Sequence, residues 1–200
     1  VCNMESNVVL VGIGGGVDYS YDGSTHHCTQ DVGIMRMLPN MAISCPYDVS
    51  TVERSVLKRG PLYIRLPRGH SGTVVKTDFG GFQIIGSGKS FILTYGMMVH
   101  KILGLLAMLG RSDIGVIAVD TLKPLDTMRL GILLTSAKRV MVVETHSRIG
   151  GLYDALQGVA TCGMSHYAFD DVFCDVGGSL EFVEERSGLD FGQLISELKE

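Results

Sequence analysis

FILTYGMMVHKILGLLAMLGRSDIGVIAVD, residues 91–120, decides the fold class of this 200-residue chain. The apolar runs FILTYG (91–96) and IGVIAVD (114–120) have the length of strands, and MMVHKILGLLAMLG (97–110) between them has the length of a helix. A strand, a helix and a second strand in this order form a βαβ unit, which is typical of a parallel sheet. We therefore predict an α/β fold.

The rest of the second half continues this alternation. We predict a helix at 127–137, a strand at 140–145, a helix at 150–163, a strand at 172–178 and a helix at 189–200. The last of these, LDFGQLISELKE, alternates apolar and charged groups at helical spacing, so it should dock as a terminal helix.

The first half predicts fewer elements. Strands are expected at 8–13, 41–46 and 61–69, and helices at 29–38 and 48–58. The run VVLVGI at 8–13 is typical of a parallel strand buried on both faces. Asp48 or Ser50 can cap the second helix, and Glu53 is expected in its first turn.

A stretch without regular periodicity, HSGTVVKTDFGGFQ (70–83), separates the two halves. It is rich in Gly, Thr and Ser, which is typical of a linker. We predict a first domain at 1–75, a linker at 76–90 and a second domain at 91–200. Three strands and two helices are too few to form a doubly wound sheet covered on both faces, so the first domain has the content of half a domain.

Composition limits the classes of partner. Hydrophobic residues make up 46% of the chain, charged residues 19%, and the net charge is -4, so no basic surface is expected to hold nucleic acid or an anionic membrane. No leader peptide and no membrane span are recognisable, which predicts a cytoplasmic protein with neither partner. The five cysteines lie far apart and are expected to be small buried side chains, not disulfides or a zinc site.

Two glycine-rich stretches look like nucleotide-binding motifs but do not complete them. In VGIGGGVD (11–18), Val17 stands where the third glycine of G-x-G-x-x-G belongs. In GSGKS (86–90), Gln83 stands where the first glycine of a phosphate loop belongs, and a strand rather than a helix follows. We expect a surface turn at 86–90 and no dinucleotide site at 11–18.

The stretch YDGSTHHCTQD (21–31) places polar side chains past the carboxyl end of a predicted strand, where open α/β sheets bind ligands. Asp22 can orient a hydroxyl or an imidazole, and His26 and His27 titrate near neutral pH, so this stretch could relay protons. Alternatively, it is a capped loop in which Asp22 or Thr25 satisfies backbone donors and the histidines are merely exposed. Spacing alone supports both interpretations.

Five blocks carry a family resemblance. DGSTHHCTQDVGIMRMLPNMAISCPYD (22–48) and GPLYIRLPRG (60–69) closely resemble the pyrimidine-binding domain of the transketolase family of thiamine diphosphate enzymes. ILTYGMMVHKIL (92–103), DTLKPLD (120–126) and VMVVETHSRIGGL (140–152) resemble the C-terminal domain of that family. The resemblance covers nearly the whole chain. It implies a partial pyrimidine-binding parallel-sheet domain followed by a Rossmann-like three-layer α/β/α C-terminal domain.

The resemblance also implies roles for single residues. Asp22 and His26 match the acid and the histidine that face the reacting sugar, so they are the implied catalytic residues: the imidazole exchanges a hydroxyl proton and the acid orients the neighbouring hydroxyl. Arg68 matches the arginine that holds the sugar phosphate, and His27, where transketolases often have glutamine, is the other implied substrate-binding residue. Arg65 lies three residues before Arg68 on the same strand, so it should face the opposite side and miss the ligand.

The chain departs from the family pattern in what it lacks. Gly14 stands where the family usually has another phosphate-binding histidine. The part of the pyrimidine-binding domain that carries the activating glutamate and the stacking aromatics has no counterpart in these residues, nor has the diphosphate-and-magnesium domain. We therefore expect no cofactor-binding residue and no metal ligand that could be assigned within the chain.

These departures imply partners. Thiamine diphosphate and Mg²⁺ would be held largely by an N-terminal diphosphate-binding domain or subunit, so the chain alone should be inactive. A homodimer is expected as well. The opening VCNMESN (1–7), one element before a core strand, favours a piece of a longer protein over a split subunit.

The function implied by the resemblance is transfer of a two-carbon ketol unit between sugar phosphates. Deoxyxylulose-phosphate synthase and the β chain of a 2-oxo acid dehydrogenase are the alternatives among enzymes. Outside the enzymes, the alternative is a non-catalytic assembly or regulatory module. Glu144 and His146 in the block ETHSRIGG (144–151) are expected to be structural, at a turn before a helix start at Gly150–Gly151 or at a subunit contact.

Overall fold

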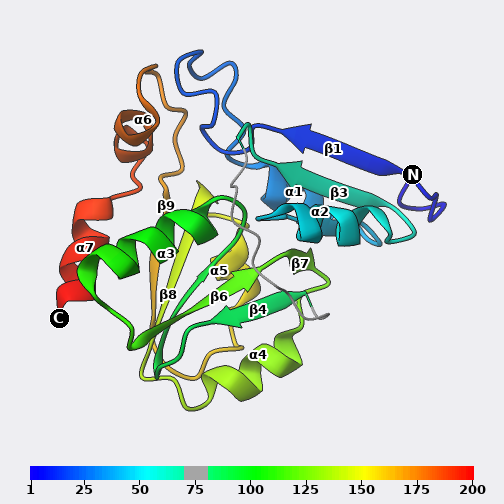
Figure 1. Cartoon of the computed structure of the whole chain (residues 1–200). Coiled ribbons are helices and arrows are strands. Elements are labelled where there is room, and N and C mark those ends of the chain that lie inside the picture. Colours follow the sequence, from blue (N-terminus) through cyan, green and yellow to red (C-terminus); the bar gives the residue numbers. More distant parts are fainter. Residues whose placement is uncertain (70–80) are drawn as a thin grey trace.

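The computed structural model describes residues 1–69, here called the first half, and residues 81–200, the second half (Figure 1). The first half contains β1 (Val9–Ile13), α1 (Asp31–Met37), β2 (Ala42–Ser44), α2 (Val49–Val56) and β3 (Leu62–Leu66). The second half contains β4 (Phe82–Ile85), β5 (Ser90–Thr94), α3 (Met98–Leu109), β6 (Ile114–Val119), β7 (Thr121–Lys123), α4 (Thr127–Leu134), β8 (Arg139–Ser147), α5 (Leu152–Ala155), β9 (Met164–Phe169), α6 (Leu180–Arg186) and α7 (Phe191–Lys199). The predicted α/β class is confirmed.

The described strands form two sheets, and parallel pairing dominates both. The first sheet has the order β1-β3-β2-β7, with β1 and β2 parallel to β3 and with β7 antiparallel to β2. The second sheet has the order β4-β6-β5-β8-β9, in which β4 is antiparallel to β6 and all other pairs are parallel. The two antiparallel strands, each at the edge of its sheet, were not predicted.

Strand β7 joins the two halves. It follows β6 of the second sheet after the single residue Asp120, yet it pairs with β2 of the first sheet. The carbonyl oxygen of Asp120 accepts hydrogen bonds from the backbone N–H of Cys45 and from the hydroxyl of Ser44, both at 2.9 Å. The second half therefore supplies the fourth strand of the first sheet.

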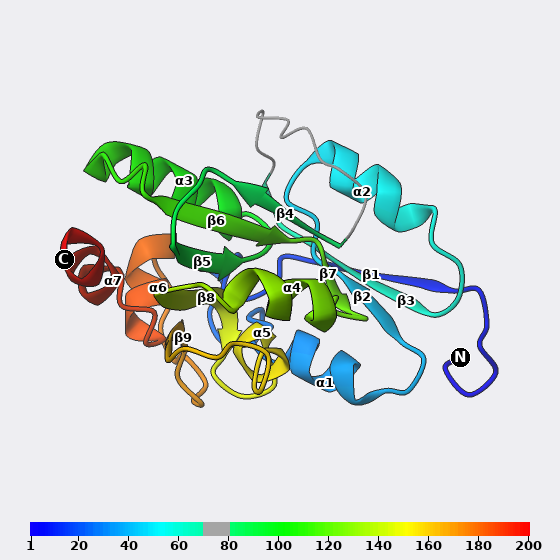
Figure 2. The same ribbon diagram turned by 90° about the horizontal axis from the view of Figure 1, so that it is seen from below.

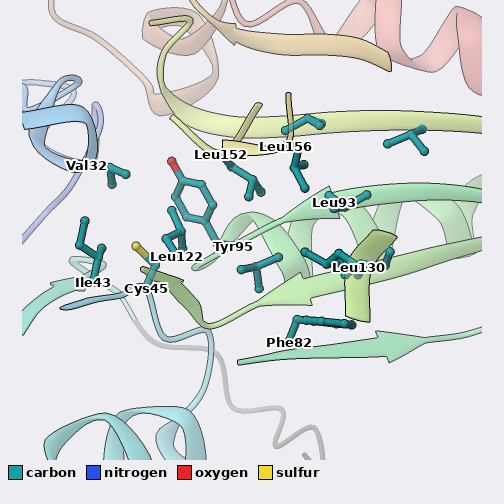
Figure 3. Close-up of a cluster of buried hydrophobic side chains, with 14 of the residues drawn as sticks. Val32, Ile43, Cys45, Phe82, Leu93, Tyr95, Leu122, Leu130, Leu152 and Leu156 are labelled. Carbon is teal, nitrogen blue, oxygen red and sulfur yellow. The ribbon is translucent and has the colours of Figure 1, made fainter. Parts of the chain in front are cut away.

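One hydrophobic cluster extends across both halves (Figure 3). In it, Val32, Ile43 and Cys45 of the first half pack with Tyr95 and Leu122 of the second. Helices α4 and α5 cover this face of the second sheet through Leu130, Leu134, Leu152 and Leu156. The opposite face packs against α3, α6 and α7 through Met98, Ile102, Leu106, Val183, Leu194 and Leu198. The second half thus has the predicted three layers, seen from below in Figure 2.

Alternation along the central strands explains their continuous apolar runs. In β5, Phe91 and Leu93 belong to the cluster shared with the first half, whereas Ile92 belongs to the cluster under α3. In β8, Val142 and Met141 divide in the same way. Both faces of the sheet are buried, so the middle of each strand, Phe91–Leu93 in β5 and Val140–Val143 in β8, is continuously apolar.

Several local predictions were wrong. The region 172–178 forms no strand, and Phe173 there is 82% exposed; the last strand is instead β9, which contains Ser165 and His166. The helix predicted at 150–163 is only the short α5, and α6 was not predicted. Strand β1 is exposed on the described chain rather than buried, with Ile13 61% accessible.

Smaller details also differ. Asp48 caps α2 by accepting a hydrogen bond from the backbone N–H of Thr51 at 2.8 Å, as predicted, but Glu53 lies beyond the first turn. None of the cysteines forms a disulfide, but only Cys45 is buried, and Cys28 is exposed. The predicted surface turn at 86–90 connects β4 to β5, whose first residue is Ser90. Across the two described ranges, no helix is both long and apolar enough to cross a membrane.

Strand β4 falls within 76–90, the predicted linker, of which residues 76–80 lie outside the described residues. The division into domains at 1–75 and 91–200 stays a prediction.

Candidate functional site

The polar stretch 21–31 lies in the loop between β1 and α1, at the carboxyl end of β1. The loop is closed at its base by Gly16 and Cys28, which exchange two backbone hydrogen bonds of 2.8 Å. Beyond this closure the chain turns twice, with the N–H of Asp22 bonded to Tyr19 and the N–H of His26 bonded to Gly23, both at 3.0 Å. The closure presents Asp22 and His26 on an exposed tip.

Tyr19 fills the space beside the end of β1. A Cβ atom added to Gly14 would lie 2.1 Å from the Tyr19 ring, so the ring can lie there only because residue 14 has no side chain. The family's usual histidine at this position could not be accommodated without moving the ring. The departure at Gly14 therefore has a structural reason, which the sequence did not reveal.

The ring of Tyr19 also brings two of the predicted residues together. The His26 ring lies with its centroid 6.3 Å from that of Tyr19, and the Arg68 guanidinium carbon lies 4.9 Å from the same centroid. The backbone N–H of Arg68 donates to Asp18 Oδ2 at 3.1 Å, which fixes the segment after β3 beside the loop. His26 and Arg68, far apart in the sequence, thus share one neighbourhood, and Tyr19 and Asp18 were missed by sequence reasoning.

The two adjacent histidines have different surroundings. His26 is exposed, and its Nδ1 lies 3.0 Å from the hydroxyl oxygen of Thr25. His27 is partly buried, with both ring nitrogens covered. Burial, followed by the charge on His26, lowers the pKa of His27, so its ring is neutral at pH 7. A substrate-binding role for His27 stays a prediction, as does the catalytic role of the exposed Asp22.

Arg65 is buried between the halves, whereas Arg68 is exposed. The Nε of Arg65 donates to Asp31 Oδ2 at 2.8 Å, and the hydroxyl of Tyr63 donates to the same oxygen at 2.7 Å. Its Nη2 donates to the carbonyl oxygen of Thr145 at 2.8 Å. Burial on its own lowers the pKa of Arg65, but the charge of Asp31 outweighs it and raises the pKa, so the buried ion pair stays charged.

Gly15 makes room for this buried arginine. A Cβ atom on Gly15 would lie 2.3 Å from Arg65 Nε, and the hydrogen bonds of the guanidinium leave it no free direction in which to move. We expect Gly15→Ala to lower the free energy of unfolding by about 1–3 kcal/mol through overpacking. Unfolding by denaturant measures this change in free energy.

Gly104→Ala is the matched control for Gly15→Ala. Gly104 lies in α3, and an added Cβ would meet no atom within 4 Å. That variant should be unchanged or more stable by up to about 1 kcal/mol. Equal behaviour of the two variants would contradict the packing argument.

The end of β8 and the segment after it contact the first half at several points. The backbone N–H of Ser147 donates to the carbonyl of Thr29 at 2.7 Å, and the N–H of Gly33 donates to His146 Nε2 at 3.1 Å. Arg36 Nη1 donates to the carbonyl of Gly151 at 2.7 Å. His146 therefore lies at a contact between the two halves of one chain, a role its sequence position did not indicate.

Glu144 is structural, as predicted. Its carboxylate, fully buried, accepts hydrogen bonds from the backbone N–H groups of Leu152 at 2.7 Å and Tyr153 at 3.1 Å, at the start of α5. Tyr95 and His166 also donate to it. Burial alone raises the pKa of Glu144, but the bonds from His166 and Leu152 outweigh it and lower the pKa, so the carboxylate is ionised.

A cavity of about 250 Å³ lies between the halves, behind the loop. Its charged lining residues include Asp18, Arg65, Lys101 and Glu184. Lys101 pairs with Glu184 and Arg65 pairs with Asp31, while Asp18 accepts the backbone N–H of Arg68. Burial raises the pKa of Asp18 and of Glu184. Neither Asp22 nor His26 lines this cavity, and we assign no ligand to it.

The possible metal-binding side chains are spread across the described residues. Within residues 1–69 and 81–200, no group of three or more His, Cys, Asp or Glu side chains is arranged to hold a metal ion.

Comparisons with known proteins agree with this architecture. The family model for the transketolase pyrimidine binding domain matches residues 1–73, and that for the transketolase C-terminal domain matches residues 86–169. The two matches together span most of the chain, which belongs to the transketolase family. It comprises part of the pyrimidine-binding domain and the C-terminal domain.

Individual relatives have several names. A subunit of the apulose-4-phosphate transketolase from Actinobacillus succinogenes is 28% identical over 76% of this chain and 52% of its own length. The 1-deoxy-D-xylulose-5-phosphate synthase of Gloeobacter violaceus is 31% identical over 68% of this chain and 24% of its own length. A solved split-gene transketolase, described as an inactive β4 tetramer, superposes with a TM-score of 0.82 at 27% identity, over all of this chain and 68% of that one. The chain spans about half of the apulose-4-phosphate transketolase subunit and about a quarter of the synthase.

Proposed function

We propose that this chain is the C-terminal part of a thiamine diphosphate-dependent enzyme that transfers a two-carbon ketol unit between sugar phosphates. The observation that carries the proposal is the convergence of His26 and Arg68 on Tyr19, at the carboxyl ends of β1 and β3. An imidazole and a guanidinium within reach of one exposed surface suit a phosphorylated polyol, because one group exchanges a proton and the other binds the anion.

His26 is the proposed proton-transfer residue. The Thr25 hydroxyl bonds to its Nδ1, and Nε2 is the atom proposed to face the substrate. Because the hydroxyl can donate or accept, either tautomer of the ring is supported, so Nε2 can accept a hydroxyl proton in one step and return it in the next. Asp22, on the same exposed tip, is proposed to orient the neighbouring hydroxyl.

Arg68 is the proposed phosphate ligand. It is exposed and forms no ion pair with any residue of the described ranges, whereas Arg65 is committed to Asp31. A guanidinium held beside an aromatic ring still offers its N–H groups to a phosphate.

Mg²⁺ and the diphosphate are proposed to be held by protein outside this chain, as the membership of the transketolase family implies. When bound, thiamine diphosphate would supply the electron sink for breaking the carbon–carbon bond of the donor. A diphosphate-binding domain or subunit is the proposed partner, together with a second copy of the assembly. Among the described strands β1 lies at the edge of its sheet, and its exposed side chains, Val11 at 53% and Ile13 at 61%, support a protein neighbour there.

The test is reconstitution with the diphosphate-binding part. Ketol transfer between sugar phosphates is expected for the assembly with thiamine diphosphate and Mg²⁺, and none for the chain alone. The identity with a 1-deoxy-D-xylulose-5-phosphate synthase favours that reaction as the second candidate, so formation of its product instead would select it. Assembly without either activity would favour a non-catalytic module.

Replacing Arg68 tests the phosphate role. We expect Arg68→Gln to raise the KM of phosphorylated donors roughly 10- to 100-fold, since a charged hydrogen bond is lost, and to leave unphosphorylated donors unchanged. Steady-state kinetics of the assembly measure both.

Arg111→Gln serves as the control for Arg68→Gln. Arg111 lies in the turn after α3, paired with Asp113 at 2.8 Å, and its replacement should alter neither KM. Equal losses of Arg68→Gln on phosphorylated and unphosphorylated donors would refute the anchoring role.

A further inference from the structure

Three consecutive residues at the end of β8 each hold a different part of the first half. Thr145 accepts from Arg65 of β3, His146 accepts from Gly33 of α1, and Ser147 donates to Thr29 at the end of the loop. All three residues belong to the second half, outside the region with predicted catalytic residues. They are called the β8 clamp below.

The hydrogen bonds of His146 fix its protonation. The side chain is fully buried, and its Nδ1 lies 2.7 Å from the carbonyl oxygen of Ser147, which can only accept. Nδ1 therefore carries the proton. Nε2 is then a bare acceptor, and it receives the N–H of Gly33 at 3.1 Å. The bond requires the neutral ring.

His146 also replaces a missing helix cap. Helix α1 begins at Asp31, and the residue at its N-cap position, Gln30, makes no side-chain capping hydrogen bond. Gly33 is in the first turn, where N–H groups lack acceptors within the helix. An imidazole from the other half supplies the acceptor that a Ser, Thr, Asp or Asn at position 30 would normally give.

The clamp acts on the segment that follows His26, between the tip of the loop and α1. Cys28, two residues after His26, is bound to Gly16, and Thr29 is held by Ser147. Directly afterwards, α1 is held by His146. The second half therefore holds the carboxyl end of the loop.

From this geometry we infer that His146 is a positioning residue. It caps α1 from the second half and, with Ser147, sets the position of the loop that carries His26. Its effect on turnover rests on the proposed function, whereas its effect on the loop does not. The C-terminal domain thereby takes part in forming the catalytic surface.

Amide hydrogen exchange in the complete assembly tests the structural part. His146→Phe keeps a ring of similar size without an acceptor, and the peptide covering 24–34 should exchange roughly five- to tenfold faster, the loss expected for one helix cap. His146→Gln, whose amide oxygen can reach the Nε2 position, should restore most of the protection. His146→Asn, which can reach only the Ser147 carbonyl, should not. His166→Phe is the matched control, because His166 bonds to Glu144 inside the second half.

Kinetics of the same variants test the catalytic part. His146→Phe should lower kcat while the KM for the sugar phosphate stays the same, and His146→Gln should recover kcat. Unchanged exchange at 24–34 in a folded variant would overturn the clamp. Faster exchange with an unchanged kcat would reduce His146 to a stabilising residue and overturn the positioning role.

The experiment also distinguishes a variant that fails to fold from a failure of the proposed function. If His146→Phe does not fold, the comparison of His146→Asn with His146→Gln decides, since equal exchange in those two variants would overturn the inference. A wild-type assembly without turnover would refute the proposed function instead, and hydrogen exchange would still decide whether His146 holds the loop.

Discussion

His26→Ala is expected to lower kcat of the reconstituted assembly by about 10²- to 10⁴-fold, the usual range for loss of a general acid–base group. The imidazole is exposed on the tip of the loop, and its only hydrogen bond to another described residue is with Thr25. Its removal should therefore leave folding intact. Single-turnover kinetics measure the loss, and the melting temperature tests the fold.

Thr25→Val provides a graded comparison with His26→Ala. It keeps the ring but removes the hydroxyl that bonds to Nδ1, so a loss smaller than that of His26→Ala is expected. An unchanged kcat in His26→Ala would remove His26 from the mechanism. A drop accompanied by unfolding would show that its contribution is to stability.

Arg65→Leu has the largest expected effect on stability, a loss of about 3–5 kcal/mol in the free energy of unfolding. Leucine fills much of the space but leaves the carboxylate of Asp31 buried with only Tyr63 as a donor to Oδ2. Its other oxygen, Oδ1, is buried without a hydrogen bond to the described residues. Thermal unfolding of the assembly should show a drop of roughly 6–20 °C.

Two variants make the Arg65 result specific. Arg68→Leu removes an exposed guanidinium and should change the stability by less than about 0.5 kcal/mol. The double variant Arg65→Leu/Asp31→Leu removes the stranded charge and should recover part of the loss. If the two single arginine variants lose stability equally, the assignment of Arg65 to the buried interior is wrong.

The sequence predicted the central elements well because their burial is uniform. Strands β5, β6 and β8 are buried on both faces, which leaves continuous apolar runs that cannot be confused with loops. Strand β9 was missed because Ser165 and His166 interrupt such a run. Both side chains have carboxylate partners, Glu197 for Ser165 and Glu144 for His166, and those partners lie on other elements.

In the candidate site, too, some residues could be predicted from the sequence and others only from the fold. Asp22, His26 and Arg68 could be proposed because their blocks resemble a family pattern. Tyr19 carried no such pattern, and its importance follows from a contact with Gly14 that only the fold reveals. His146 was expected to be structural, and only the observed bond to Gly33 indicates which part of the molecule it supports.

Strand β7 has a consequence for how the chain could be divided. It is covalently the continuation of β6 but is hydrogen bonded into the sheet that carries the loop, and the surrounding core is common to both halves. The two segments that the family models recognise separately thus share a sheet and a core, and we expect them to unfold together. Grafting the C-terminal segment of a relative onto residues 1–69 would therefore replace one side of a core that both halves share. It would also replace β7, the strand that completes the first sheet.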